Sequence, residues 1–201
     1  LAWLRSLPDD YMTKKQTVSY AGLFDDVGAD AWYASSVDYV KYGRLMYGTG
    51  NNLFQPDAQM TRAMFAQVLY ALEGSPSVRG LSCPFTDAGG SWYTDAVIWA
   101  YHAGVVAGVS ATQFAPNEAL TREQMVTMLY GYAGRDEQLY GSDGALASYQ
   151  DQASVSDWAR EAMAWAVSTG VITGTSTTTL APQKIGTRAE VATVLMQFCE
   201  Q

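Results

Sequence analysis

Residues 114–132 read FAPNEALTREQMVTMLYGY, a proline-containing loop followed by a stretch with helical periodicity. Thr121 is a typical helix N-cap, and Gln124 three residues later completes a capping box. Apolar residues then recur four, seven, eight and eleven residues after the threonine, at Met125, Met128, Leu129 and Tyr132. This spacing places them on one face of a helix. The stretch therefore predicts a helix that begins after Thr121 and buries one side.

The same pattern occurs twice more, so the chain is a tandem repeat of three copies. Each copy is anchored on a tryptophan, at Trp32, Trp92 and Trp158. In every copy a glycine follows 16 residues later, a proline 24 residues later, and a Thr-Arg pair 29 and 30 residues later. These Thr-Arg pairs are Thr61-Arg62, Thr121-Arg122 and Thr187-Arg188. Internal repeats of this kind determine the architecture of a chain.

Each copy is predicted to form a helix, a loop and a second helix. The first helix begins near the tryptophan, with apolar residues five and eight positions after it, and the loop ends at the proline. One such unit cannot cover its own apolar stripe. We therefore expect an all-α fold in which three helix-loop-helix copies form a compact, pseudo-three-fold bundle. The expected boundaries are an N-terminal arm at 1–23 and copies at 24–74, 85–134 and 149–201.

Composition excludes several classes of function. The 201 residues carry a formal net charge of −8, which disfavours nucleic acid and anionic membrane surfaces as partners. The longest apolar run, residues 97–109, is too short to span a membrane. No cofactor motif or metal-ligand cluster occurs, and His102, the only histidine, is expected in an apolar environment. Cys83 and Cys199 favour free thiols, with a disulfide between them left open. Because residue 1 is not Met, we expect a processed protein or part of a longer one.

The three arginines are the strongest candidates for a function. Each follows the N-cap, where a cation meets the positive end of the helix dipole at a cost of about 0.3–1 kcal/mol. Helix formation therefore does not explain why Arg62, Arg122 and Arg188 recur. They could form ion pairs with carboxylates, for which the candidates are Asp26, Asp87 and Asp151. Alternatively, they could bind an anion together with free helix N–H groups.

The tryptophans also have two interpretations. A tryptophan at the start of a helix is usually a core residue, and sequence alone favours that role for Trp32, Trp92 and Trp158. A tryptophan ring is also a suitable surface for a sugar. The two roles are compatible if part of the ring lines a groove.

The repeated blocks resemble the S-layer homology family. The matching text is FDDVGADAWY, YGTGNNLFQP and MTRAMF in the first copy, with counterparts in the other two, from residue 24 to about residue 198. The resemblance implies an extracellular module that holds a larger bacterial surface protein on the cell wall. Its partner would be a secondary cell-wall polysaccharide, often with pyruvate ketals on N-acetylmannosamine, bound in grooves between copies. No catalysis is expected.

The resemblance also assigns the site residues. The arginines would bind the ketal carboxylate, and the tryptophans and a loop glycine would shape each groove. That glycine is Gly104 in the second copy and Gly170 in the third, but Arg44 replaces it in the first copy, where Met64 also replaces the capping Glu or Gln. The Arg62 site is therefore predicted to be the weakest. The alternative function is a protein–protein interaction or S-layer assembly module with degenerate glycan sites.

Overall fold

The computed structural model describes residues 23–134, 141–142 and 144–200, and this part of the chain is helical. It contains six α-helices and no strand beyond isolated β-bridges, which confirms the predicted all-α class. Two short 3-10 turns, η2 (Gln152–Ser154) and η3 (Asp157–Ala159), precede the first helix of the third copy. The predicted arm lies outside the described residues apart from Leu23. In chain order the helices are α2 (Ala34–Tyr42), α3 (Arg62–Leu72), α4 (Thr94–His102), α5 (Arg122–Ala133), α6 (Arg160–Ser168) and α7 (Arg188–Cys199).

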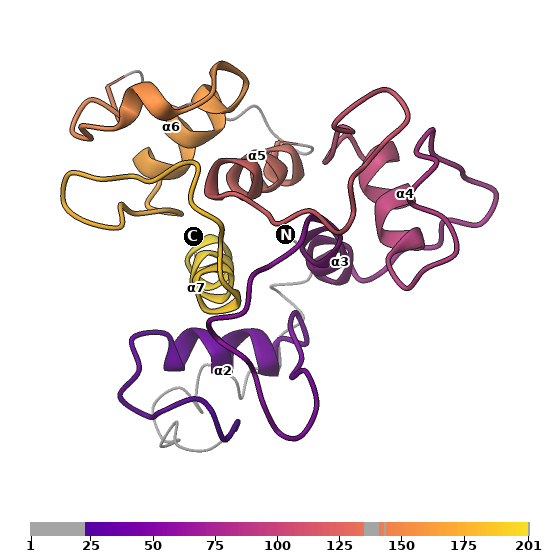
Figure 1. Cartoon of the computed structure of the whole chain (residues 1–201), viewed down its shortest axis with the longest axis horizontal. Coiled ribbons are helices and arrows are strands. Elements are labelled where there is room, and N and C mark those ends of the chain that lie inside the picture. Colours follow the sequence, from indigo (N-terminus) through magenta and orange to yellow (C-terminus); the bar gives the residue numbers. More distant parts are fainter. Residues whose placement is uncertain (1–22, 135–140, 143, 201) are drawn as a thin grey trace.

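The helices form two concentric sets. Figure 1 shows α3, α5 and α7, the second helices of the copies, around the centre, with α2, α4 and α6 outside them. The helix α3 packs on α4, α5 packs on α6, and α7 packs on α2. Each second helix is therefore covered by the first helix of the next copy, and the third copy closes onto the first. The predicted pseudo-three-fold bundle is confirmed, and the apolar stripes of all three second helices are buried.

Backbone hydrogen bonds join the three copies in a ring. Leu120 N donates to Met60 O (2.8 Å), Met60 N donates to Gly186 O (3.0 Å), and Gly186 N donates to Leu120 O (2.9 Å). These residues occupy the same position in the three copies, just before each Thr-Arg pair. Because a buried backbone group needs a partner, the copies satisfy one another at this point. The ring fixes the beginnings of the three central helices relative to each other.

The threonines cap the central helices as predicted. Each has an extended backbone, and its side chain accepts a hydrogen bond from the third helical residue. Complete capping boxes form at Thr121 with Gln124 and at Thr187 with Glu190, whereas Thr61 caps the N–H of Met64 alone. The three arginines are consequently the first residues of α3, α5 and α7.

A residue in the left-handed region ends the first helix of each copy. Gly104 (φ +69°) and Gly170 (φ +76°) adopt this conformation without a side-chain penalty. Arg44 has the same conformation in the first copy, with φ 57°. A residue with a Cβ is strained there, by about 1–2 kcal/mol. The first copy thus keeps the shape of the turn although it lacks the glycine that suits it.

Other expectations from composition can be compared with the structure. Cys83 and Cys199 are both free, as favoured. None of the helices in the described part of the chain is both long and apolar enough to cross a bilayer. The expected apolar environment of His102 is wrong, because this side chain is exposed and its Nε2 lies 2.8 Å from the carbonyl oxygen of Ser82. It lies at the C-terminal end of α4, where the helix surface faces solvent.

Candidate functional site

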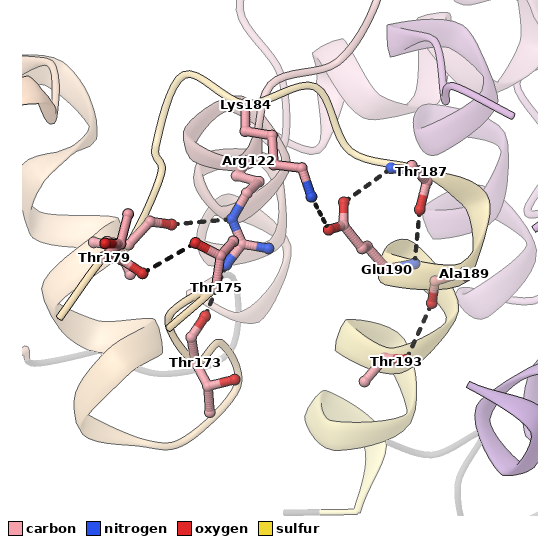
Figure 2. A network of polar contacts seen from close by, with 10 residues as sticks. Arg122, Thr173, Thr175, Thr179, Lys184, Thr187, Ala189, Glu190 and Thr193 are labelled. Atoms are coloured by element: carbon pink, nitrogen blue, oxygen red, sulfur yellow. Dashed lines mark hydrogen bonds and ion pairs between the residues drawn. The ribbon is translucent and has the colours of Figure 1, made fainter. Parts of the chain in front are cut away.

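Each arginine side chain reaches into the loop of the following copy. Arg62 donates from Nε to Phe114 O (2.9 Å) and from Nη2 to Ala107 O (3.2 Å). Arg122 donates in the same way to Leu180 O (3.2 Å) and Thr173 O (2.7 Å), as Figure 2 shows. The pattern is therefore a property of the repeat, and it places each guanidinium between two copies.

The third arginine completes the cycle. Arg188 donates from Nε to Phe54 O (2.7 Å) and from Nη2 to Tyr47 O (2.6 Å), across 134 and 141 residues of sequence. There are thus three junctions, which we name after their arginines: the Arg62 junction joins copies one and two, the Arg122 junction joins copies two and three, and the Arg188 junction joins copies three and one.

All three arginines are largely buried. Their exposed fractions are 6%, 5% and 9% for Arg62, Arg122 and Arg188. Desolvation by burial lowers the pKa of each guanidinium, and nearby carboxylates oppose that shift. Arg62 also stacks on the ring of Phe114 (4.7 Å) and Arg188 on the ring of Phe54 (4.5 Å). A cation in such a place is favourable only because carbonyl oxygens and aromatic faces replace its water.

The proposed ion pairs between arginines and aspartates are not what the structure shows. Asp87 accepts hydrogen bonds from the backbone N–H groups of Phe114 (2.9 Å) and Ala115 (2.8 Å). Asp26 and Asp151 do the same for the corresponding residues of their own copies. Each aspartate therefore holds the loop whose carbonyl oxygen receives the arginine from the preceding copy. The aspartate therefore binds N–H groups, and the arginine binds a carbonyl oxygen, of the same peptide segment.

The aspartates also stabilise an unfavourable backbone conformation. Gln55, Ala115 and Ala181, which precede the loop prolines, have φ values of 56°, 59° and 53°. The N–H of each strained residue donates to the aspartate. Burial alone would raise the pKa of Asp87, but the hydrogen bonds from the loop N–H groups lower it. For Asp151 the N–H of Leu180 makes the largest contribution to a lowered pKa.

The free helix N–H groups expected to assist anion binding are not free. Arg62 N donates to Glu118 O (3.0 Å) and Ala63 N to Pro116 O (3.0 Å). The equivalent N–H groups of α5 and α7 also donate to carbonyl oxygens of the neighbouring copy, and the third N–H is taken by the threonine cap. That expectation was wrong because the tertiary contacts between copies cannot be seen in one copy's sequence. An anion at these junctions would have to be bound by side chains.

Each guanidinium still has donors to offer. Within the described residues, Nε and Nη2 of each arginine are hydrogen-bonded, while Nη1 has no partner there. A guanidinium carries five N–H donors in a fixed plane, and two of them hold the junction together. The remaining edge is suited to a carboxylate oxygen.

The tryptophans are not core residues. Trp32, Trp92 and Trp158 are 65%, 61% and 58% exposed, so the interpretation favoured from sequence is wrong. Trp32 packs edge-on against Tyr33 and Trp92 against Tyr93, and these contacts orient the rings. Each tryptophan precedes its helix by two residues, and the buried stripe begins only after it. Each copy therefore presents one large aromatic ring to solvent at the same position, with an apolar surface on which a sugar could lie.

The departures in the first copy are distributed differently from the prediction. Arg44 lies in the first copy, whose loop receives Arg188, so this substitution belongs to the Arg188 junction. Arg62 instead contacts the loop of the second copy, which retains Gly104. The Arg122 junction combines a complete capping box with a copy that retains Gly170. It is the one junction without a departure in these positions.

Sequence reasoning missed two buried carboxylates. Glu123 is 2% exposed and Asp38 3% exposed. Burial raises the pKa of Asp38 to about 6, and its Oδ2 has no hydrogen-bond partner in the part of the chain that the structure describes. Both residues break the repeat. Ala63 and Ala189 stand where the second copy has Glu123, and Ile98 and Ala164 stand where the first copy has Asp38. A charged residue at a position that is apolar in the other copies was the signal that could have found them.

The structure also contains a pocket that none of the predicted site residues lines. It has a volume of about 580 Å³ and lies in the third copy. Asp157, Arg160 and Glu161 contribute charges of both signs to its lining. No tryptophan or arginine of the repeated motif lines it.

The three copies match the S-layer homology domain family at residues 23–66, 84–126 and 148–192. The chain therefore belongs to this family, as its sequence motifs indicated. The family occurs in S-layer proteins and in surface enzymes, and it supplies their cell-wall anchoring module. The chain is accordingly an extracellular, surface-attached anchoring module.

Relatives with known names place the module in longer proteins. The chain is 29% identical to an exoglucanase of Acetivibrio thermocellus over 89% of its own length and 16% of the relative's. It is 30% identical to a surface-layer 125 kDa protein of Lysinibacillus sphaericus, over 91% of this chain and 15% of that one. An S-layer protein of Bacillus thuringiensis subsp. finitimus is 27% identical over 89% of this chain and 21% of its own length. The chain thus spans about a fifth or less of these relatives.

Proposed function

We propose that this module anchors a larger surface protein non-covalently by binding a carboxylate-bearing secondary cell-wall polysaccharide at the junctions between copies. The expected carboxylate is a pyruvate ketal on N-acetylmannosamine. The observation that carries the proposal is the repeated guanidinium, which carbonyl oxygens of the next copy fix and whose Nη1 donors are unpaired among the described residues. Such an edge would gain about 1.5–3 kcal/mol from each charge-assisted hydrogen bond.

Local charge makes the junctions unequal for an anion. The carboxylates of Glu118 and Asp87 both act on Arg62, so an arriving carboxylate would meet two negative charges there. Among the described residues, Asp26 is the one carboxylate that acts on Arg188. At Arg122 the carboxylates of Glu190 and Asp151 both act on the guanidinium, but Glu190 is paired with Lys184, which partly cancels its charge (Figure 2). The Arg122 and Arg188 junctions are therefore the better sites.

Several weak sites on one module would be useful on a polymer. A single sugar would be held by few contacts, but a second site engages the same chain at high effective concentration. The exposed tryptophans supply apolar surface for the sugar rings beside the charged groups. Because the chain as a whole carries a net charge of −8, the arginines must provide the attraction locally.

Sedimentation with purified, protein-free cell walls tests this function. The module should bind untreated walls and lose binding after mild acid removes the ketal carboxylates. Replacing exposed Arg79 with Ala should leave binding unchanged, since this residue lies in the loop between copies one and two. Equal binding to treated and untreated walls would contradict recognition of the carboxylate.

A protein-interaction role is the second candidate, and a specific feature of the first copy favours it. Tyr42 and Tyr47 are 50% and 61% exposed, whereas the other copies have no aromatic residue except His102 at these positions. With Arg44 in place of glycine, this copy presents a surface that differs from the repeat. Binding to a surface protein in the absence of any wall material, lost on replacing both tyrosines with Ser, would support this role.

A further inference from the structure

Within the described residues, the Arg122 junction contains a cluster of hydrogen bonds that the other two junctions lack. Glu123 Oε2 accepts from Ser156 N (2.9 Å), and its Oε1 accepts from Ser156 Oγ (2.7 Å) and Gln183 Nε2 (2.8 Å). Gln183 also donates to Ser154 O (3.1 Å). One buried carboxylate of the second copy therefore binds two segments of the third copy.

Neither of the other junctions can form this cluster. Ala63 and Ala189 replace Glu123, and Asp30 and Gly90 stand where Ser156 does in the third copy. The cluster is a property of this chain's second and third copies and not of the repeat. A buried carboxylate is costly unless its oxygens are satisfied, and here three donors satisfy them. Because alanine stands at this position in the other two copies, the repeat fold does not itself require the carboxylate.

The cluster links the helix that carries Arg122 to the turn that carries Trp158. Glu123 is the residue after Arg122 on α5, and Ser156 lies two residues before Trp158. The turn η3, which contains Trp158, packs directly on α5. Fixing Ser156 to Glu123 consequently fixes the distance between the guanidinium-bearing helix and the exposed indole.

Trp158 needs such a support more than the other tryptophans do. Trp32 and Trp92 each pack edge-on against the tyrosine that follows them. Ala159 follows Trp158, so this aromatic contact is absent from the third copy. The hydrogen bonds from Ser156 to Glu123 take its place and cross the junction.

We propose that Glu123 is a positioning residue that fixes the Trp158 turn against the helix carrying Arg122, and thereby makes this junction the tightest of the three sites for a carboxylate-bearing sugar. The inference rests on the proposed function, since it assumes that Arg122 and Trp158 contact the glycan. It adds which junction dominates and which residue makes it dominant. Preorganisation of this kind raises affinity by removing the cost of ordering the site during binding.

The test is a titration with one probe, the methyl glycoside of N-acetylmannosamine carrying a pyruvate ketal. The protein is labelled with 5-fluorotryptophan, and the ¹⁹F resonances of Trp158 and Trp92 are assigned by single Trp→Phe variants. Each resonance then reports its own junction. Glu123→Ala should weaken the affinity read at Trp158 about tenfold and leave the affinity read at Trp92 within twofold.

Two further variants separate positioning from general stability. Glu123→Gln retains one carbonyl-type acceptor for Ser156 and should give an intermediate loss at Trp158. Thr193→Val removes a side-chain hydrogen bond to Ser36 across the Arg188 junction (3.2 Å) and should leave the Trp158 affinity unchanged. All titrations are run well below the measured melting temperature of each variant, so loss of folding does not enter the comparison.

The outcomes distinguish this inference from the function on which it rests. Tighter binding at Trp158 than at Trp92 in the wild-type protein, lost in Glu123→Ala, supports the inference. An unchanged Trp158 affinity in Glu123→Ala overturns it and leaves the glycan function intact. No shift of any tryptophan resonance in the wild-type protein contradicts the proposed function and the inference together.

Discussion

Replacing Arg122 with Ala should destabilise the fold as well as any ligand site. The substitution removes two hydrogen bonds from a charged donor to the carbonyl oxygens of Leu180 and Thr173. At about 1.5–3 kcal/mol each, these bonds are worth about 3–6 kcal/mol, and release from burying a cation offsets part of that sum. We expect a net loss of about 2–4 kcal/mol in the free energy of unfolding.

Urea denaturation followed by circular dichroism at 222 nm measures this loss. The matched control is Arg79→Ala, which removes an exposed arginine from the loop between copies one and two and should change stability by less than about 0.5 kcal/mol. If Arg122→Ala is as stable as Arg79→Ala, the guanidinium does not hold the junction and our interpretation of its hydrogen bonds is wrong. A loss of wall binding in an arginine-to-alanine variant therefore has to be compared with the stability of the same variant.

Four other substitutions test three separate features of the fold. Asp38→Asn should raise the free energy of unfolding at pH 7.5 by about 1–3 kcal/mol. The pKa of Asp38 is raised to about 6 in the folded protein, so the wild type is most stable below about pH 4 and loses stability as the pH rises through 6. Urea midpoints from pH 4 to 8 should therefore fall for the wild type and stay flat for the variant. Arg44→Gly should stabilise the protein and Gly104→Ala should destabilise it, each by about 0.5–1 kcal/mol, since both positions have positive φ. Thermal unfolding should therefore show a higher melting temperature for the first variant and a lower one for the second. Asp87→Asn should lower the free energy of unfolding at pH 7 by about 2–3 kcal/mol, because it breaks the hydrogen bonds to the loop. The pKa of Asp87 is lowered in the folded protein, so the difference between wild type and variant should disappear as the wild-type carboxylate protonates in acid. Urea unfolding of both proteins at pH 7 and at pH 2–3 measures this difference.

The parts of the fold that follow from one copy's sequence were predictable. Thr121 and Gln124 identify a helix start, and a period of 3.6 residues identifies its buried face. These signals are local, so they survive in any tertiary setting. The closure into a pseudo-three-fold body followed from a simple requirement, that three exposed stripes be covered by one another.

The partner of each polar group was not predictable, because partners come from other copies. Nothing near Arg62 in sequence indicates the carbonyl oxygens of Ala107 and Phe114, 45 and 52 residues away. A carboxylate such as Asp87 was the obvious partner for a cation, yet it binds backbone N–H groups of a strained loop. Backbone acceptors carry no sequence signature, so side-chain pairing was overestimated.

The exposure of Trp92 shows a second limit. A large apolar residue beside a helix is usually buried, and sequence patterns reward that assumption. Trp92 precedes the helix by two residues, on a turn that is not part of the apolar stripe. Counting the stripe from the helix start, rather than from the tryptophan, would have placed the ring outside it.

The cyclic exchange of contacts has a consequence for why the copies occur in threes. No junction exists within one copy, since each arginine is completed by the loop of the next. Two copies would form the Arg62 junction alone, where Glu118 and Asp87 both act on the guanidinium. The third copy adds two junctions at once, because it completes the Arg122 junction and contributes Arg188 to the first copy. Closure of the ring therefore provides both the missing cover for the core and the two junctions that we propose as the better sites for an anion.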